Sequence, residues 1–103
     1  MTRIITALVV ALAVSGQAQA QIKLDCPIVG KSAENIMEAR QLGMAMSELI
    51  ERAHEQSLTK YKATIMAAYE RPRFDGEEYQ QKAIDDFRNE MELACYKHNE
   101  NLN

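Results

Sequence analysis

Two cysteines, Cys26 and Cys95, carry the most constrained chemistry in this sequence. In an exported chain an even cysteine count predicts a disulfide, and two cysteines allow a single intramolecular pairing. Closing a loop of this length stabilises a fold by roughly 4 kcal/mol in the loop-entropy account. Free thiols or an intermolecular bond are the alternatives. A redox-active site is not expected, because the sequence contains no CxxC pair.

The basic pair Arg71 and Arg73 is the first interaction candidate, within the stretch YERPRFDGEEY at residues 69–79. Two forked guanidinium groups are suited to binding an anionic partner. The alternative is that they pair with Glu77 and Glu78 on a wet surface, where such pairs contribute little.

Met44 and Met46 form the second interaction candidate, in a predicted turn between helices. Flexible thioethers suit adaptable binding surfaces, and residues two apart in an extended segment point the same way. The alternative, which we favour, is that both side chains fold inward to fill a small core.

Catalytic constellations are absent from the sequence, so an enzyme is not expected and no cofactor is implied. It has no GxSxG elbow, no P-loop and no glycine-rich nucleotide turn. Ser32, Ser47 and Ser57 each stand where a helix is predicted to begin, which indicates capping rather than nucleophilic roles. Asp85 and Asp86 are adjacent, so on a helix they diverge and cannot form a carboxylate pair.

Metal binding is not expected either. His54 has Glu51 and Glu55 nearby, but HEQSL is not an HExxH motif, and His98 lies near the C-terminus. A closed metal site needs about four ligands, and both cysteines are assigned to the disulfide.

The N-terminus has the three-part order of a secretory signal peptide. Residues 1–3 carry a positive charge, residues 4–14 are apolar, and residues 15–20 end in Ala-Gln-Ala. The apolar run is too short for a membrane span, which needs about 20 residues. We therefore expect cleavage after residue 20, one mature domain at 21–103 without stable membrane insertion, and a periplasmic or secreted location in a Gram-negative bacterium.

Charge excludes one class of partner. The chain has 12 basic and 15 acidic residues, a formal net charge of −3. Because no basic excess is available to neutralise a phosphate backbone, nucleic-acid binding is not expected.

Helical periodicity predicts the elements that carry these residues. A helix is expected at 33–42 after an irregular lead-in at 27–31, and Gly43 is placed as its left-handed cap. Residues 48–69 are predicted to break at 54–57 into two helices, with one continuous helix as the alternative. The clearest helix is 77–97, followed by a frayed polar tail at 98–103. No strand alternation occurs, so the fold class is all-α: a small three- or four-helix bundle closed by one disulfide.

The corner around Pro72 predicts a helix end followed by a helix start. Asp75 and Glu78 have the spacing of a capping box, and Phe74 and Tyr79 have that of a hydrophobic staple. These four residues have a local structural explanation, which leaves the two arginines without one.

Four stretches resemble a group of small exported proteins in proteobacterial genomes and prophages, to which no activity is assigned. They are ARQLGMAMSEL (39–49), AYERPRF (68–74), QKAIDDF (81–87) and Ala94-Cys95. The resemblance implies a bacterial envelope context and makes two phage-linked roles conceivable, inhibition of an envelope enzyme and exclusion of competing phage. It carries over no functional residue.

Together these features predict a non-enzymatic exported module that binds another protein, an unidentified one of the bacterial envelope. The alternative is a small periplasmic stress chaperone active at acid pH, which size, helicity and a single disulfide also fit.

Overall fold

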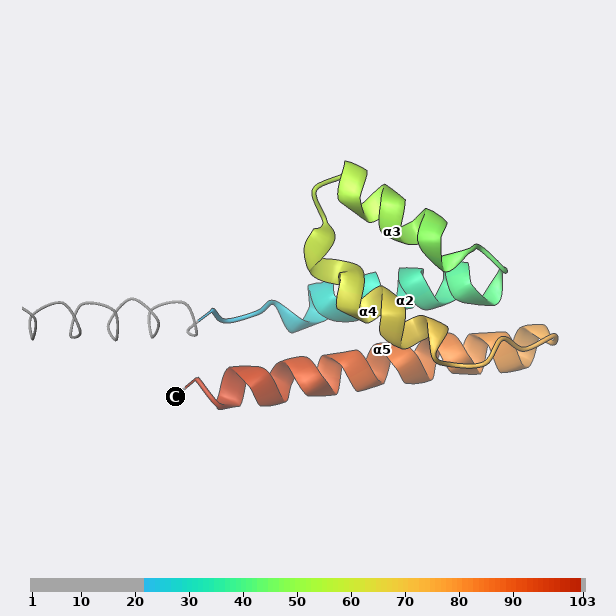
Figure 1. The fold of residues 1–103 in the computed structure, drawn as a ribbon. Helices are drawn as coiled ribbons and strands as arrows, with labels where there is room; N and C mark the ends of the chain where they lie inside the picture. Colours follow the sequence, from blue (N-terminus) through green and yellow to red (C-terminus); the bar gives the residue numbers. More distant parts are fainter. Residues whose placement is uncertain (1–21, 103) are drawn as a thin grey trace, which may run out of the picture.

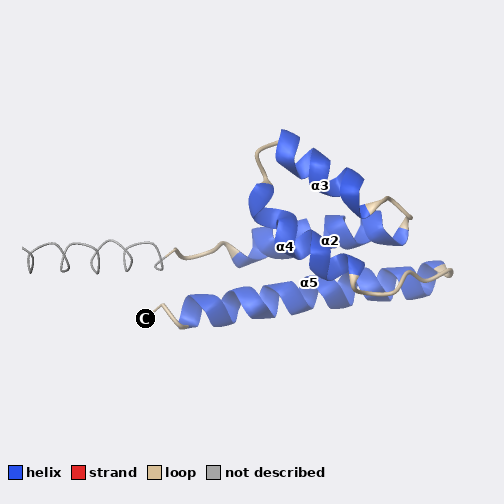
Figure 2. Cartoon of the chain, viewed as in Figure 1, coloured by secondary structure: helices blue, strands red, loops and turns tan. Residues whose placement is uncertain are grey.

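A computed structural model describes residues 22–102, which form four α-helices and one short 3₁₀ helix with no β-strand in that range (Figures 1 and 2). The fold class expected from the sequence, a small all-α bundle with one disulfide, is confirmed. The expected signal peptide at 1–20 lies outside the described residues. The elements are α2 (Cys26–Gln41), α3 (Met46–Glu55), η3 (Thr59–Tyr61), α4 (Lys62–Tyr69) and α5 (Glu77–Glu100).

Helices α2 and α5 form the long antiparallel pair of the bundle and lie side by side in Figure 1. Helix α4 packs against α2, while α3 packs against α4 and η3 at the outside of the molecule. The core lies where α2, α4 and α5 meet, and its buried side chains are Ala33, Ile36, Met37, Ile65, Ala68, Ile84 and Phe87. Helix α3 contributes no buried residue.

Helix α2 begins earlier than the sequence pattern predicts. The irregular lead-in at 27–31 and the cap at Ser32 are wrong, because the helix starts at Cys26 and the Asp25 side chain accepts a hydrogen bond from Ile28 N. Pro27 is tolerated in the first turn, where a backbone N–H has no helical partner. Gly43 ends this segment with φ +91°, the expected left-handed conformation.

The predicted break within residues 48–69 is present, but the predicted caps are wrong, both Ser47 before the first of the two helices and Ser57 before the second. Ser47 is the second residue of α3, whose N-cap is Ala45 without a side-chain hydrogen bond. Ser57 lies in the turn after α3 with φ +60°, and Leu58 precedes the 3₁₀ helix.

The capping box predicted at the start of α5 is also absent. Gly76, not Asp75, is the N-cap, and it makes no side-chain cap hydrogen bond. The aromatic contact does form, since the Phe74 and Tyr79 ring centroids lie 6.4 Å apart. Gln80 Nε2 donates instead to the Phe74 carbonyl oxygen at 2.6 Å.

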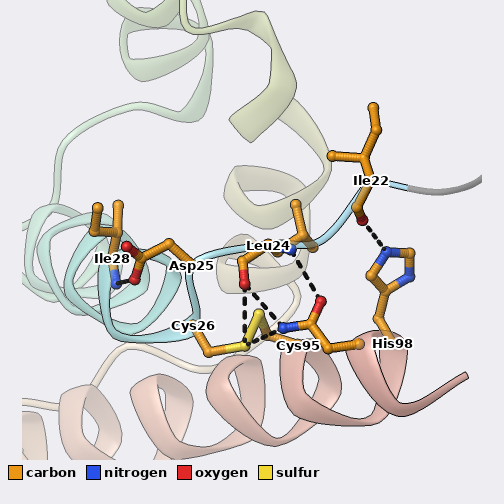
Figure 3. The surroundings of a disulfide bond; sticks show 8 residues. Ile22, Leu24, Asp25, Cys26, Ile28, Cys95 and His98 are labelled. Atoms are coloured by element: carbon orange, nitrogen blue, oxygen red, sulfur yellow. Dashed lines mark hydrogen bonds between the residues drawn. A yellow bond between two sulfur atoms is a disulfide. The ribbon is translucent and has the colours of Figure 1, made fainter. Parts of the chain in front are cut away.

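The predicted frayed tail is wrong over residues 98–100, because α5 continues to Glu100. Asn99 exchanges two hydrogen bonds with the Leu24 backbone, at 2.8 and 2.9 Å. His98 Nε2 lies 3.0 Å from the Ile22 carbonyl oxygen (Figure 3). The last turn of α5 is therefore held by the segment that leads into α2.

Candidate protein-binding surface

The disulfide between Cys26 and Cys95 joins the first residue of α2 to the last third of α5 (Figure 3). Their Cα atoms are 5.6 Å apart and both side chains are buried. The pairing predicted from the cysteine count is confirmed. Because the bond fixes only one end of the long helix pair, other contacts must hold the opposite end.

Gln41 fastens that opposite end, and its side chain is only 1% exposed. Its Nε2 donates to the Pro72 carbonyl oxygen at 2.9 Å, and its Oε1 accepts from Phe74 N at 2.9 Å. Gln41 is not among the residues that the sequence patterns single out. Its one available signal is position, because Gln41 continues the row of Ala33 and Met37 at intervals of four.

Arg73 takes part in the same fastening. Its Nε donates to the Gln41 carbonyl oxygen at 2.9 Å, which occupies an acceptor at the end of α2. Arg40 also crosses to this loop, where its Nε and Nη2 donate to the Arg71 carbonyl oxygen at 3.2 and 3.1 Å. We call these hydrogen bonds between Arg40 and Gln41 at the end of α2 and residues 71–74 the loop latch.

Arg71 forms a forked pair with Glu90 of α5, not with Glu77 or Glu78 as considered from the sequence. Its Nη1 donates to Glu90 Oε1 at 2.8 Å, and Nη2 donates to the other oxygen. This hydrogen bonding lowers the pKa of Glu90 and raises that of Arg71. The guanidinium also lies 5.3 Å from the Phe87 ring centroid, so Arg71 has internal partners on two sides.

The two methionines proposed as a contact pair lie in different environments. Met44 is half-buried, and its carbonyl oxygen accepts a hydrogen bond from the Tyr69 hydroxyl at 2.6 Å. Burial by surrounding protein raises the pKa of that hydroxyl. Met46 is the first residue of α3 and remains 40% exposed. Of the two methionines, Met46 is therefore the more exposed one.

Met46 belongs to an apolar depression that runs between α3 and α4. Two hollows, of about 620 and 400 Å³, share Met46 as a wall. Met66 stands in the second hollow and is 49% exposed. The apolar residues that line these hollows include Met46, Ile50, Ala53, Ala63, Met66 and Ala67, and we call this surface the Met46–Met66 groove.

Small side chains give the Met46–Met66 groove its depth. Ala63 and Ala67 lie one turn apart on α4 and line the same hollow as Met46 and Met66. Charged residues border the groove, with Glu51 and Lys62 at one hollow and Glu70 at the other. An apolar strip with charged borders is the pattern that an amphipathic helix complements.

The remaining polar candidates stand apart from one another. His54 lies at the edge of the groove beside Glu51, while His98 contacts the N-terminal segment. Asp85 and Asp86 accept hydrogen bonds from Gln81 and Lys82 respectively. Residues 22–102 bring no three of His, Cys, Asp or Glu into a group that could hold a metal ion.

In the described part of the chain, no helix has both the length and the apolar character needed to cross a bilayer. Comparisons with protein-family models, curated proteins and solved structures found no match.

Proposed function

We propose that this protein is an exported helical module that acts by binding another protein of the bacterial envelope. The main support for this proposal is the Met46–Met66 groove, an apolar surface on the outer helices that the chain itself does not fill. The signal-like N-terminus supports export, and the disulfide is compatible with an oxidising compartment.

The Met46–Met66 groove is a better candidate for the partner-binding surface than Arg71 and Arg73. Arg71 already donates hydrogen bonds to Glu90, and Arg73 donates one to the end of α2. Binding a partner there would therefore compete with contacts that stabilise the fold. Binding at Met46 and Met66 would not compete with such hydrogen bonds, and the flexible side chains of both residues adapt to a partner surface.

The partner segment that fits best is an amphipathic helix. Its apolar side would lie on Ala63 and Ala67, with Met46 and Met66 packing around it. Its charged flanks would meet Glu51, Lys62 and Glu70 at the borders.

A photocrosslinking experiment tests this proposal. A photoreactive amino acid replaces Met66 in the exported protein, and a second strain carries it at Ala94, an exposed position on α5. We expect one envelope protein to crosslink from position 66 and not from position 94. Crosslinks that are equal at both positions, or none at position 66, would contradict the groove as the contact surface.

Substitutions in the groove provide the matched control. Ala63→Arg places a long charged side chain on the exposed face of α4, and Ala94→Arg makes the same change on α5. Ala63→Arg should weaken affinity for the crosslinked partner at least tenfold, or about 1.4 kcal/mol, while Ala94→Arg leaves affinity unchanged. Circular dichroism of both variants checks that the helices are retained.

An acid-active chaperone is the second candidate function, and the ion pairs that join different elements favour it. Arg71–Glu90 links the loop to α5, and Arg88–Glu34 links α5 to α2, so both cross-element pairs need an ionised carboxylate. At about pH 3 the protein would loosen, expose apolar surface and suppress client aggregation. A light-scattering assay distinguishes the two roles, because a dedicated binder would give no client protection in acid.

A further inference from the structure

A second cleft lies on the other side of α3, between that helix, α2 and η3. It has a volume of about 280 Å³, and its floor includes Ile36 of α2 and Ile65 of α4. Both isoleucines are buried members of the core. The cleft therefore reaches the core from the surface, and we call it the α3 cleft.

The walls of the α3 cleft are apolar and incompletely covered. Leu49 and Ala53 come from α3, while Leu58 and Tyr61 come from the segment around η3. All four are half-buried, and α3 has no fully buried residue. A ligand that covered this surface would be stabilised by removing apolar area from water.

The rim of the cleft is polar and carries one type of charge. Arg52 is the only charged side chain among its lining residues, and Asn35 and Gln56 add amide groups. Within residues 22–102 the structure shows no ion pair to Arg52, although Arg71 and Arg88 are both paired. A free guanidinium at the mouth of an apolar cleft is suited to binding a carboxylate through two parallel hydrogen bonds.

We infer that the α3 cleft binds a small organic carboxylate with a short alkyl chain. The chain would lie on Ile36 and Ile65, and the carboxylate would meet Arg52 at the rim. The modest volume is near the lower end of ligand pockets, which favours a short chain over a long one. This inference is independent of protein binding at the Met46–Met66 groove.

Titration with octanoate, followed by two-dimensional NMR of the full mature protein, tests the inference. We expect saturable shifts in the signals of Ile36, Leu49 and Ile65, which line the α3 cleft and not the Met46–Met66 groove. Octylamine has eight carbons, like octanoate, but the opposite charge, and acetate has the carboxylate without the long chain. Both should bind at least tenfold more weakly than octanoate, because each lacks one of the two complementary features.

Variants separate the charge from the cavity. Arg52→Gln should weaken octanoate binding about tenfold, or about 1.4 kcal/mol, and Arg52→Lys should weaken it less. Lys97→Gln removes the same charge from exposed α5 and should leave the affinity unchanged. Ala53→Leu fills part of the cleft and should reduce binding without changing the charge.

Three results would overturn the inference. Octylamine could bind as tightly as octanoate, which removes the role of charge. Arg52→Gln could leave the affinity unchanged although its spectrum shows a folded protein. The shifts could grow linearly without saturation, or centre on Met46 and Met66, which would indicate nonspecific adsorption or the other groove.

Discussion

Gln41 shows how one polar side chain can decide the path of a loop. Its position is in the core row of α2, yet it carries an amide that satisfies Pro72 O and Phe74 N at once. A buried amide is stabilising only if its donors and acceptors find partners. The loop after α4 supplies them, so the loop must lie against the end of α2.

Replacement of Gln41 tests this account. Gln41→Ala leaves two backbone groups of the loop without their partner and should lower the free energy of unfolding by about 1–3 kcal/mol. Gln80→Ala is the matched control, because it removes one exposed hydrogen bond to the same loop and should cost less than about 1 kcal/mol. Urea denaturation measures both, and equal losses would contradict the fastening role.

Glu90 gives the fold a dependence on pH. Arg71 lowers the pKa of Glu90 below its ordinary value of 4.5, so the pair stabilises the folded state above that value. This contribution is lost as the pH falls through the lower folded-state pKa. Both side chains are partly exposed, so the pair contributes at most about 1 kcal/mol.

Melting curves between neutral and acid pH should reveal this contribution. Glu90→Gln should lower the melting temperature at pH 7 and make it fall less steeply below pH 4.5. Glu100→Gln, at the exposed end of α5, should follow the wild type throughout. An unchanged acid slope in Glu90→Gln would show that other carboxylates control the acid transition.

At the scale of elements, the turn at Gly43 sets how α3 leaves α2. Gly43 has φ +91°, and a Cβ there would lie 3.3 Å from Arg73 Nη2 of the loop latch. A side chain at this position would therefore strain the backbone and crowd the latch.

Gly43→Ala should destabilise the protein by about 1–2 kcal/mol. The control is Gly76→Ala at the start of α5, where a Cβ would also lie 3.3 Å from a neighbouring side chain, Tyr79, but φ is −93°, so the two sites differ in the left-handed backbone at Gly43. That change should stay within about 1 kcal/mol, because a weaker cap is offset by a less flexible unfolded chain. Thermal unfolding of the two variants compares them, and a neutral Gly43→Ala would contradict the assigned strain.

At the scale of the whole molecule, the long α2–α5 pair is fixed at both ends by different means. The disulfide joins residues 69 positions apart at one end, and the loop latch holds the other end. A domain this small has little core, so a covalent link is a large part of its stability.

The double substitution Cys26→Ser/Cys95→Ser measures that part. It should lower stability by about 4 kcal/mol in the loop-entropy account, which is comparable to the whole stability of a weak domain of about 5 kcal/mol. Wild-type protein in reductant is the control and should show the same loss. Hydrogen exchange should rise first at residues 22–28 and 95–100, and unchanged exchange there would contradict the role of the disulfide.

Sequence patterns predicted the helices correctly where apolar residues recur at helical spacing over several turns. Ile84 and Phe87 belong to the stripe of the predicted helix at 77–97, and both are buried. Start positions were the main errors, since Ser32, Ser57 and Asp75 have good capping side chains that the structure does not use as caps. Capping contributes only about 1 kcal/mol, so tertiary packing can override it, and at Ser32 the covalent link at Cys26 adds to that packing.

The sequence by itself determined the fold class and the disulfide, because helical periodicity and the cysteine count are local or combinatorial properties of the chain. Only the tertiary structure decided what the arginines and methionines do. Arg71 and Arg73 bind partners 19 and 32 positions away, and Met46 and Met66, from two helices, line the same hollow. Such contacts depend on how the helices pack, and no spacing along the chain encodes them.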